Sequence, residues 1–545
     1  MGYRHALLGS AALIGLGAST AALTAQETSA AQVEFDLILR GGTVYEGTGK
    51  PGTQADVGIS GGRIRALGQL AQHGARATID VKGLCVAPGF IDTHAHAESG
   101  IVRRPEARNF VFMGVTTIVS GNCGNSARDL AKAFQQIEKR RPSVNYASLI
   151  GHNTVRSAVL GRAARAPSPE ELSKMEKLVD QAMRDGAMGL STGLIYLPGT
   201  FAKTDELIAL AKVVGRHQGL YASHMRNEAD RVLDAIDEAL RIGAQAGIPV
   251  HLSHLKASGK TNWGRGKAIL EKLTTARAAG HRVTGDQYAY KASSTGLDVL
   301  FPSQALSIGR LAFSTRLRED LEFQAKMHAA LLSKLAETGF TDFSYCQVSW
   351  AKNNDEVSGM NLAQIAERFF GKADRDTQAR AAIKLFIDSG GSSRVNMVYH
   401  KMSEADVVTI MRAPFVSVAC DAGIRTIKGV SKPHPRGAGN NARVLGYFVR
   451  EKSVLGLPLA IQKMTGLPAR VFGLQQRGQV RIGFHADLTV FDATTVAGRA
   501  SYQEPRLQPA GIPLVLVNGV PVVRDGKHTG ERPGKVLRRA TGDGR

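Results

Sequence analysis

The sequence predicts an α/β fold: a (β/α)8 TIM-like barrel, a small β-sandwich domain built from both chain ends, and an inserted lid segment. Three observations support this fold class. After residue 84, short apolar runs alternate with helix-like stretches; polar residues follow most of the runs; and both chain ends contain strand-like segments bounded by glycine. Eight alternating strand and helix units are typical of a (β/α)8 barrel, whose functional residues lie at the C-terminal ends of the strands.

Eight apolar runs within residues 85–469 are the candidate barrel strands. Their spacing is regular, since 27 positions separate His96 from Cys123 and 30 separate His224 from His254. A repeat of this length fits one strand, one helix and their connections. The eight runs are residues 85–96, 116–123, 146–152, 187–193, 220–224, 248–254, 282–288 and 415–421.

Helical patterns fill most of the intervals between these runs. Residues 168–186 begin with Ser168-Pro169, which suits an N-cap followed by proline at the first helical position. In residues 228–247, apolar residues recur at i, i+4, i+7 and i+8 counted from Val232, which places them on one helical face. Both stretches therefore predict amphipathic helices covering the barrel.

One interval is much longer than the others. From Tyr288 to Asp421 there are 133 positions, so residues 296–413 are predicted to form an insertion within the barrel. A long insertion beside a functional site is more often an ordered lid than a linker. We expect a mixed α/β lid above the barrel mouth.

The two chain ends are predicted to form one domain. Residues 33–84 and 470–535 contain apolar or alternating segments between glycines, and Asn518-Gly519 is a strong signal for a β-hairpin turn. These two ranges are expected to share the small β-sandwich. Beyond Lys535 we expect no regular structure.

Residues 1–31 have the composition of a signal peptide with an uncertain cleavage site. Arg4 and His5 precede an apolar run that ends near Ala25, with small residues suited to cleavage. The alternative is an uncleaved membrane anchor, but glycines dilute the hydrophobicity of the run. No later run of 18 or more apolar residues occurs, so the mature chain is expected to be exported, periplasmic or secreted, and to have no membrane span.

Composition narrows the possible partners. The chain has 545 residues and a formal net charge of +22, which would permit nucleic-acid binding. Aromatic residues make up only 6%, and no zinc-finger, RNP or helix-turn-helix pattern is present, so we expect no nucleic-acid partner. The positive charge favours anionic small molecules or envelope polymers. Four cysteines in so long a chain do not form a disulfide framework.

Side chains able to bind a metal lie at the C-terminal ends of five of the eight runs. His94 and His96 end the first run, and because alternate side chains of a strand share a face, their Cα atoms lie roughly 7 Å apart with both imidazoles on one side. Cys123, His224, His254 and Asp421 end later runs. A thiolate with imidazoles is a normal first shell for zinc, and an open position leaves room for water. Each residue alone has an ordinary structural explanation, but six of them at five strand ends predict a metal site.

These residues lie in motifs that resemble the amidohydrolase superfamily and, within it, the D-aminoacylase (N-acyl-D-amino-acid deacylase) family. The resemblance extends from Asp36 to Lys527, and its cysteine-containing GNCG motif is the most specific mark, since related hydantoinases bridge their metals with a carboxylated lysine instead. One departure is Gly439-Asn440-Asn441-Ala442, where the family has a glycine-threonine-phenylalanine stretch. The motifs are GFIDTHAHAE, GVTTIVSGNCG, GLSTGLIYLPG, YASHMRNE, HLSHLK, DQYAYKASST and HPRGAGNNARVLG.

The resemblance implies a role for each matching position. A tightly held zinc ion would be bound by Cys123, His224 and His254. A second, weaker metal position would use His94, His96, Asp421 and the bridging Cys123. Lys256, Tyr288 and Arg436 would hold the carboxylate of an acyl-amino acid, and Tyr196 would lie near the scissile amide.

The implied reaction is hydrolysis of the amide bond of N-acyl-D-amino acids. Zinc chemistry makes water nucleophilic near neutral pH and polarises a carbonyl group. Asp421 is the candidate base that takes the proton of water and returns it to the leaving nitrogen. Two alternatives stay open at this point: another amidohydrolase reaction (on a dipeptide, a cyclic amide or a lactone), or a non-catalytic binding protein on the same scaffold.

Overall fold

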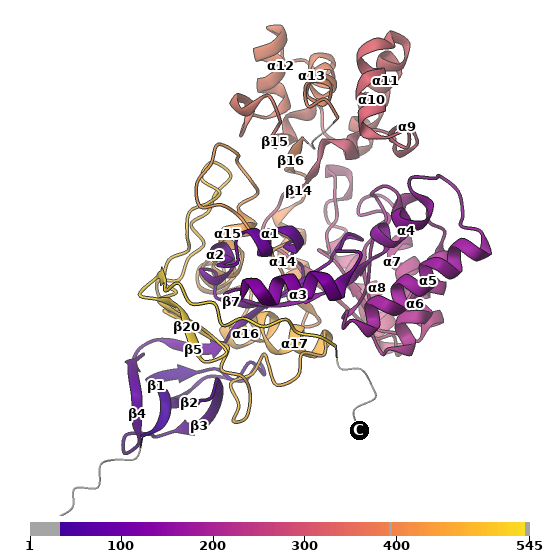
Figure 1. Cartoon of the computed structure of the whole chain (residues 1–545). Helices are drawn as coiled ribbons and strands as arrows, with labels where there is room; N and C mark the ends of the chain where they lie inside the picture. The colour runs from indigo at the N-terminus through magenta and orange to yellow at the C-terminus, as the bar shows by residue number, and fades with distance from the viewer. Residues whose placement is uncertain (1–32, 392–394, 540–545) are drawn as a thin grey trace, which may run out of the picture.

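The computed structural model describes residues 33–391 and 395–539 and has the predicted α/β fold class (Figure 1). Its central strands form two parallel sheets, β6-β7-β8 and β9-β10-β11-β12-β13-β17, in which only Leu149 separates β8 from β9. A parallel bridge between Ala95 and Ala422 joins the end of β6 to the segment after β17. The strands are β6 (Phe90–Asp92), β7 (Val115–Ser120), β8 (Asn145–Ser148), β9 (Ile150–Gly151), β10 (Gly189–Gly193), β11 (Leu220–His224), β12 (Val250–Leu252), β13 (Val283–Gln287) and β17 (Val416–Val418).

The first predicted run is divided between two sheets. Residues 85–96 contain β5 (Cys85–Pro88), which pairs with strands of the terminal sheet, and β6, which is the first barrel strand. The chain passes from one sheet to the other at Gly89, where a Cβ atom would lie 2.2 Å from Thr116 Oγ1. The prediction of one continuous strand from Cys85 was therefore wrong, because an apolar run alone does not show where a chain leaves a sheet.

Helices cover the barrel strands, as the amphipathic patterns predict. The helix α5 (Pro169–Arg184) begins with a capping box in which Ser168 accepts from Glu171 N, and Pro169 occupies its first turn. Its buried face and those of its neighbours join the large apolar core around the strands. The other barrel helices are α1 (Glu98–Arg103), α2 (Arg108–Val111), α3 (Leu130–Arg140), α4 (His152–Leu160), α6 (Thr204–Arg216), α7 (Val232–Ala246), α8 (Gly266–Ala278), α14 (Glu404–Met411), α15 (Arg436–Arg443), α16 (Leu457–Met464) and α17 (Gly466–Val471).

The inserted segment forms a lobe of its own, which stands above the barrel in Figure 1. It has an apolar core separate from that of the barrel, with members from Leu297 to Tyr399. Three antiparallel strands lie at its base in the order β14-β16-β15. Its elements are β14 (Ser293–Gly296), α9 (Ser303–Leu306), α10 (Arg310–Glu319), α11 (Leu321–Thr338), β15 (Cys346–Trp350), α12 (Leu362–Phe370), α13 (Arg375–Asp388) and β16 (Asn396–Tyr399).

The C-terminal end of this lobe differs from the predicted residue 413. The helix α14 packs on α8 and β13, and its buried residues Val407 and Ile410 belong to the barrel core. The chain thus returns to the barrel close to Lys401. The length of the interval predicted an insertion but could not locate its last residue, because α14 is the ordinary barrel helix before β17.

Both chain ends contribute to one nine-stranded sheet, in the order β21-β20-β19-β18-β5-β1-β2-β3 with β4 beside β1. Strands from the two ends share an apolar core that includes Leu39, Val57 and Leu516. Asn518 (φ 48°) and Gly519 (φ 82°) form the turn between β19 and β20, and positive φ at both residues is typical of a hairpin turn. The strands are β1 (Val33–Val44), β2 (Thr53–Ser60), β3 (Arg63–Gly68), β4 (Gly74–Asp80), β18 (Leu488–Phe491), β19 (Leu514–Val517), β20 (Val520–Arg524) and β21 (Lys527–His528).

Two terminal segments lie against the barrel instead. Phe472, predicted to belong to the small domain, packs in an apolar cluster with Ile91 and Ala222 of barrel strands. Beyond Lys535, where no regular structure was expected, Leu537 N donates to Tyr146 O at 2.7 Å. Residues 1–31 lie outside the described residues. Within the part of the chain that the structure describes, no helix is long and apolar enough to cross a membrane.

Removing one partner of a buried ion pair should destabilise the fold strongly. Glu206 on α6 is buried against Arg156 and accepts a hydrogen bond from His152 Nε2 at 2.8 Å. Burial alone would raise the pKa of Glu206, but His152 and Arg156 lower it to below its usual value. Glu206→Gln should reduce the free energy of unfolding by about 3–5 kcal/mol, because the Arg156 charge would remain buried without a counter-charge.

Urea unfolding at pH 7 measures this loss, with Asp234→Asn as the control at the exposed Arg231–Asp234 pair, where a change below about 0.5 kcal/mol is expected. Because the folded pKa of Glu206 is lowered, its contribution is present above the pKa of the unfolded chain and is lost as the pH falls through the folded value. Equal stability of Glu206→Gln and the parent protein would contradict the prediction.

Candidate functional site

The six predicted metal-binding residues converge at the C-terminal ends of the barrel strands. His94 and His96 follow β6, Cys123 follows β7, His224 ends β11, His254 follows β12 and Asp421 follows β17. These side chains lie close together because parallel strands bring their C-terminal ends to one end of the barrel. Residues distant in sequence therefore form one cluster.

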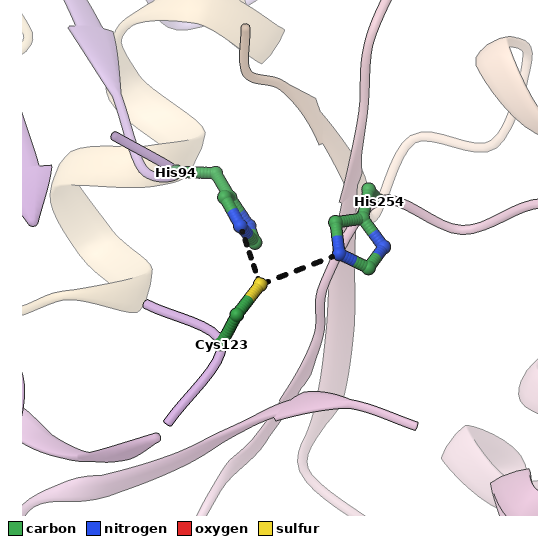
Figure 2. A group of neighbouring side chains, drawn as sticks. All are labelled: His94, Cys123 and His254. Carbon is green, nitrogen blue, oxygen red and sulfur yellow. Dashed lines mark hydrogen bonds between the residues drawn. The ribbon is translucent and has the colours of Figure 1, made fainter. Parts of the chain in front are cut away.

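The Cys123 thiol lies at the centre of this cluster. Its Sγ atom is 3.2 Å from His94 Nε2, 3.5 Å from His224 Nδ1 and 3.6 Å from His254 Nε2. Figure 2 shows His94 and His254 directed at the sulfur from two different strand ends. Burial raises the pKa of the Cys123 thiol, and the charges of Asp421 and Glu228 raise it further. A cation in the cluster would favour the thiolate instead.

Asp421 lies between two histidines and an arginine. Its Oδ1 atom is 3.1 Å from His96 Nε2 and 3.7 Å from His94 Nε2, while Oδ2 is 2.9 Å from Arg436 Nη2. Burial alone would raise the pKa of Asp421, but Arg436 and His94 lower it to well below its usual value. The side chain is therefore an ionised carboxylate, able to accept a proton or bind a cation.

Glu228 is a site residue that the sequence interpretation missed. Its Oε1 atom lies 2.9 Å from His254 Nδ1 and 2.5 Å from Lys256 Nζ. Lys256 is thus in a buried ion pair, and its Nζ is also 2.6 Å from His254 Nδ1. Burial alone would raise the pKa of Glu228, but Lys256 and the nearby imidazoles lower it. The sequence feature that could have identified Glu228 is its position four residues after His224.

Asp286, at the end of β13, is a second residue that was missed. It accepts from His254 N at 2.6 Å and from His251 Nε2 at 2.9 Å, and it lies 3.5 Å from His94 Nδ1. It therefore faces the imidazole of one candidate metal ligand, His94, as outer partners of metal ligands commonly do, and it holds the backbone of a second candidate, His254. Asp286 was a polar residue in the seventh apolar run, so its strand position was the signal that could have found it.

Three residues of the cluster have left-handed backbone conformations. Cys123 has φ 51°, His254 has φ 37° and Asp421 has φ 50°. Such conformations are uncommon for residues other than glycine and occur preferentially at functional sites. Each places a side chain at the point where the chain leaves its strand, so that it turns into the barrel mouth.

The remaining predicted residues line the same mouth. The Arg436 guanidinium lies 4.4 Å from the ring centroid of Tyr288, and its Nε and Nη1 atoms are buried without hydrogen-bond partners among the described residues. The Tyr196 ring is 4.9 Å from that of His224, and its hydroxyl accepts from Thr295 at 3.1 Å. Burial raises the pKa of both tyrosines, so their hydroxyls stay protonated.

Asn440, within the stretch that departs from the family, has a structural role beside the site. Its Oδ1 atom accepts from Ala289 N at 2.8 Å, and its Nδ2 atom donates to Ala419 O at 3.0 Å. These bonds connect the segments after β13 and β17, which carry Tyr288 and Asp421. The substitution thus keeps the two segments together through an amide side chain.

The donor set fits a zinc ion. His94, Cys123 and His254 offer ligand atoms within 4.8 Å of one another, as do the sets His94–His96–Asp421 and His224–Glu228–His254. Two buried imidazole nitrogens, His94 Nδ1 and His224 Nε2, have no hydrogen-bond partner among the described residues. A thiol with several imidazoles is the ligand chemistry that zinc prefers, and the adjoining carboxylates could complete a second position.

Comparisons with known proteins agree with this geometry. The chain is 37% identical to N-acyl-D-glutamate deacylase from Alcaligenes xylosoxydans xylosoxydans over 530 residues, covering 93% of this chain and 97% of the relative. A crystal structure of N-acyl-D-glutamate deacylase from Bordetella bronchiseptica, in complex with zinc and a phosphonate mimic of the tetrahedral intermediate, matches with a TM-score of 0.77 and 35% identity over 92% of this chain and 99% of that one.

A D-aminoacylase structure described by its binuclear metal centre matches with a TM-score of 0.78 and 34% identity, over 93% of this chain and 100% of that one. The family model described as the amidohydrolase family matches residues 77–523. These matches confirm the resemblance expected from the sequence motifs and the predicted fold class. The chain, with its thiol and imidazoles at the strand ends, belongs to the amidohydrolase family.

Proposed function

We propose that this protein is a zinc-dependent hydrolase that cleaves the amide bond of N-acyl-D-amino acids into a carboxylate and a free D-amino acid. The observation that carries the proposal is the Cys123 cluster beside the Asp421–Arg436 pair, where a potential base and an anion-binding guanidinium lie at one metal-binding site. The relatives named as deacylases of N-acyl-D-amino acids support the same substrate class.

The metal would be held by residues of three strand ends. Cys123, His224 and His254 are proposed for the tightly bound zinc, with His94, His96 and Asp421 available for a second ion that shares the thiol. When bound, zinc supplies Lewis acidity, which polarises the amide carbonyl and makes water nucleophilic near neutral pH. Asp286 holds the backbone N–H of His254, and Glu228 contacts the His254 imidazole at Nδ1.

Asp421 is the proposed acid–base group. Its ionised carboxylate takes a proton from the water that attacks the carbonyl carbon, and it then passes that proton to the departing nitrogen as the C–N bond breaks. The contact with Arg436 keeps the carboxylate charged and oriented before the reaction. One residue thus acts first as base and then as acid.

The substrate carboxylate is proposed to bind at Arg436. The unpartnered Nε and Nη1 atoms of this guanidinium leave N–H groups that can donate charge-assisted hydrogen bonds to a carboxylate. Tyr288, under the guanidinium, adds a protonated hydroxyl. Lys256 contributes charge, although Glu228 already neutralises part of it.

The direct test is an assay of stereo-defined substrates with the purified, zinc-loaded protein. N-acetyl-D-amino acids with acidic, apolar and polar side chains are compared with their L-isomers, with dipeptides, hydantoins and lactones, and the zinc content is measured alongside. We expect zinc-dependent release of free amino acid from D-isomers only. Turnover confined to dipeptides, cyclic amides or lactones would overturn the proposal, and no turnover on any substrate would favour a binding protein.

Arg436→Ala should distinguish substrates that carry a free carboxylate from those that do not. We expect KM for N-acyl-D-amino acids to rise by about 10- to 100-fold, the cost of roughly 1.5–3 kcal/mol for lost hydrogen bonds to a charged group. The KM of the corresponding primary amides should change much less, whereas kcat should fall for both because Asp421 loses a partner.

Steady-state kinetics with matched acids and amides measure this difference, and Lys452→Ala, which removes an exposed cation, serves as the control. An equal rise in KM for acids and amides would show that Arg436 does not bind the substrate carboxylate.

We also propose export of the mature chain, supported by the composition of residues 1–31. N-terminal sequencing of protein recovered from the periplasm and the medium tests it, with cleavage between Ala22 and Ala31 as the expected result. Retention of Met1 in a cytoplasmic fraction would contradict it.

A further inference from the structure

Lys401 lies where the inserted lobe joins the barrel, beside the mouth that holds the candidate site. Its carbonyl oxygen accepts from Gly259 N at 2.9 Å and from Trp263 Nε1 at 3.2 Å, and both donors belong to the segment between β12 and α8. The same segment carries His254 and Lys256. The backbone of Lys401 is therefore held against a part of the chain that contributes directly to the site.

The neighbours of Lys401 connect it with the residues proposed to hold the substrate. The Tyr288 hydroxyl donates to Sδ of the next residue, Met402, at 3.9 Å, and the Tyr288 ring lies against the Arg436 guanidinium. The Lys401 ammonium itself lies 5.4 Å from the centroid of the Tyr399 ring, at the end of β16. Lys401 is thus placed between the base of the lobe and the residues around Tyr288.

The Lys401 ammonium has no charged partner. Its side chain is half-buried, and among residues 33–391 and 395–539 it forms no ion pair and no hydrogen bond. Burial lowers the pKa of Lys401, whereas the charge of Glu228 opposes this shift and that of Lys256 adds to it. Glu228 already pairs with Lys256. This side of the mouth therefore has a cation without a counter-charge of its own, which favours an anionic group from a substrate.

The amino-acid half of the substrate is the part nearest to Lys401. This step rests on the proposed function, in which Arg436, Tyr288 and Lys256 hold the α-carboxylate. The scissile carbonyl then lies at the Cys123 cluster, and the acyl group begins there. The side chain shares a carbon atom with the α-carboxylate, so it begins beside the residues that Lys401 adjoins.

We propose that Lys401 is a specificity-determining residue that binds the side-chain carboxylate of the substrate, so that N-acyl derivatives of acidic D-amino acids are preferred. The ammonium would donate charge-assisted hydrogen bonds to this second carboxylate, while Arg436 holds the first. A lysine suits this role because its flexible four-carbon stem can follow carboxylates on side chains of different length.

The test compares two substrates of almost the same shape, N-acetyl-D-glutamate and N-acetyl-D-glutamine. Both carry the α-carboxylate, and only the first has a charged side chain. With the zinc-loaded, full-length protein, kcat/KM should be at least about tenfold higher for the glutamate compound, and Lys401→Gln should lower this ratio by about tenfold or more, because a hydrogen bond between charged groups is lost. Lys401→Arg, which keeps the charge, should still prefer glutamate.

Lys334→Gln is the control for long-range charge, since Lys334 is an exposed lysine of α11 whose charge also acts on Lys401. It should change the ratio by less than about twofold. A ratio near one in the parent protein, or an unchanged ratio in Lys401→Gln, would overturn the proposal, as would equal changes in Lys401→Gln and Lys334→Gln. Partial misfolding of a variant lowers both rates in one preparation and cancels in the ratio.

A second substrate pair, N-succinyl-D-alanine and N-butyryl-D-alanine, places the charge on the acyl group instead. A Lys401-dependent preference for the succinyl compound, without one for glutamate, would assign Lys401 to the acyl half and overturn the proposal. If no N-acyl-D-amino acid is hydrolysed, the proposed function fails, and calorimetric titration of the glutamate and glutamine compounds into the same proteins still tests Lys401. The ratio of the two dissociation constants should then respond to Lys401→Gln as described for kcat/KM, and an unchanged ratio would contradict the proposal.

Discussion

Asp421→Asn should lower kcat by about 10²- to 10⁴-fold, the usual contribution of a general acid–base group. Asparagine has nearly the same shape and can still accept a hydrogen bond from Arg436, which lies 2.9 Å from Oδ2. It has no charge and cannot take a proton from water near neutral pH. The chain should therefore fold normally and retain zinc on Cys123, His224 and His254. Steady-state kinetics with metal analysis on the same preparation measures both properties.

Asp234→Asn is the matched control, because it makes the same chemical change at an exposed position on α7 and should leave kcat unchanged. A near-normal rate for Asp421→Asn would refute the proposed proton transfer. If zinc content fell in proportion to kcat, Asp421 would instead be a ligand of the tightly bound ion, and the two results distinguish these roles.

Cys123→Ala should remove both tight zinc binding and activity. The Cys123 sulfur lies within 3.6 Å of three imidazole nitrogens, and it is the ligand proposed to be shared by the two metal positions. Loss of an outer partner of a metal ligand typically lowers metal affinity by roughly 10- to 100-fold. Loss of the Cys123 sulfur should lower zinc affinity by more than this. Zinc per chain, measured by elemental analysis after dialysis, is expected to fall from about one to well below one.

Cys346→Ala provides the control for this prediction. Cys346 is also buried and free, but it lies in the apolar core of the inserted lobe. Its replacement should cost about 1 kcal/mol of stability and leave zinc content unchanged. Unchanged zinc stoichiometry in Cys123→Ala would show that the thiol is not a ligand, and would leave the imidazoles and carboxylates as the metal-binding set.

Local patterns were sufficient to predict the barrel elements. The eight apolar runs overlap the barrel strands β6 to β13 and β17, and the Ser168 cap and the Asn518-Gly519 turn occur as expected. These predictions are correct because periodicity, capping and turn chemistry depend on residues a few positions apart. Two boundaries had no local signal. One is Gly89, where a single apolar run passes from one sheet to another. The other is the start of α14, where the chain returns from the insertion to the barrel.

The candidate site was predictable in part for a similar reason. His94, Cys123 and the other candidate metal-binding residues end apolar runs, and parallel strands bring such positions together. Glu228 and Asp286 were missed because carboxylates are common after strands and before helices, so neither stands out in the sequence. Their roles depend on which imidazole nitrogen each one faces.

The sequence by itself determined the family, the strand order and the identity of the chemical groups at the strand ends, because these follow from residue type and spacing along the chain. The tertiary structure alone decided which groups touch. It pairs Asp421 with Arg436 and Lys256 with Glu228. The physical reason is that charge pairing and burial are properties of distances in space, and residues brought into contact here lie as many as several hundred positions apart.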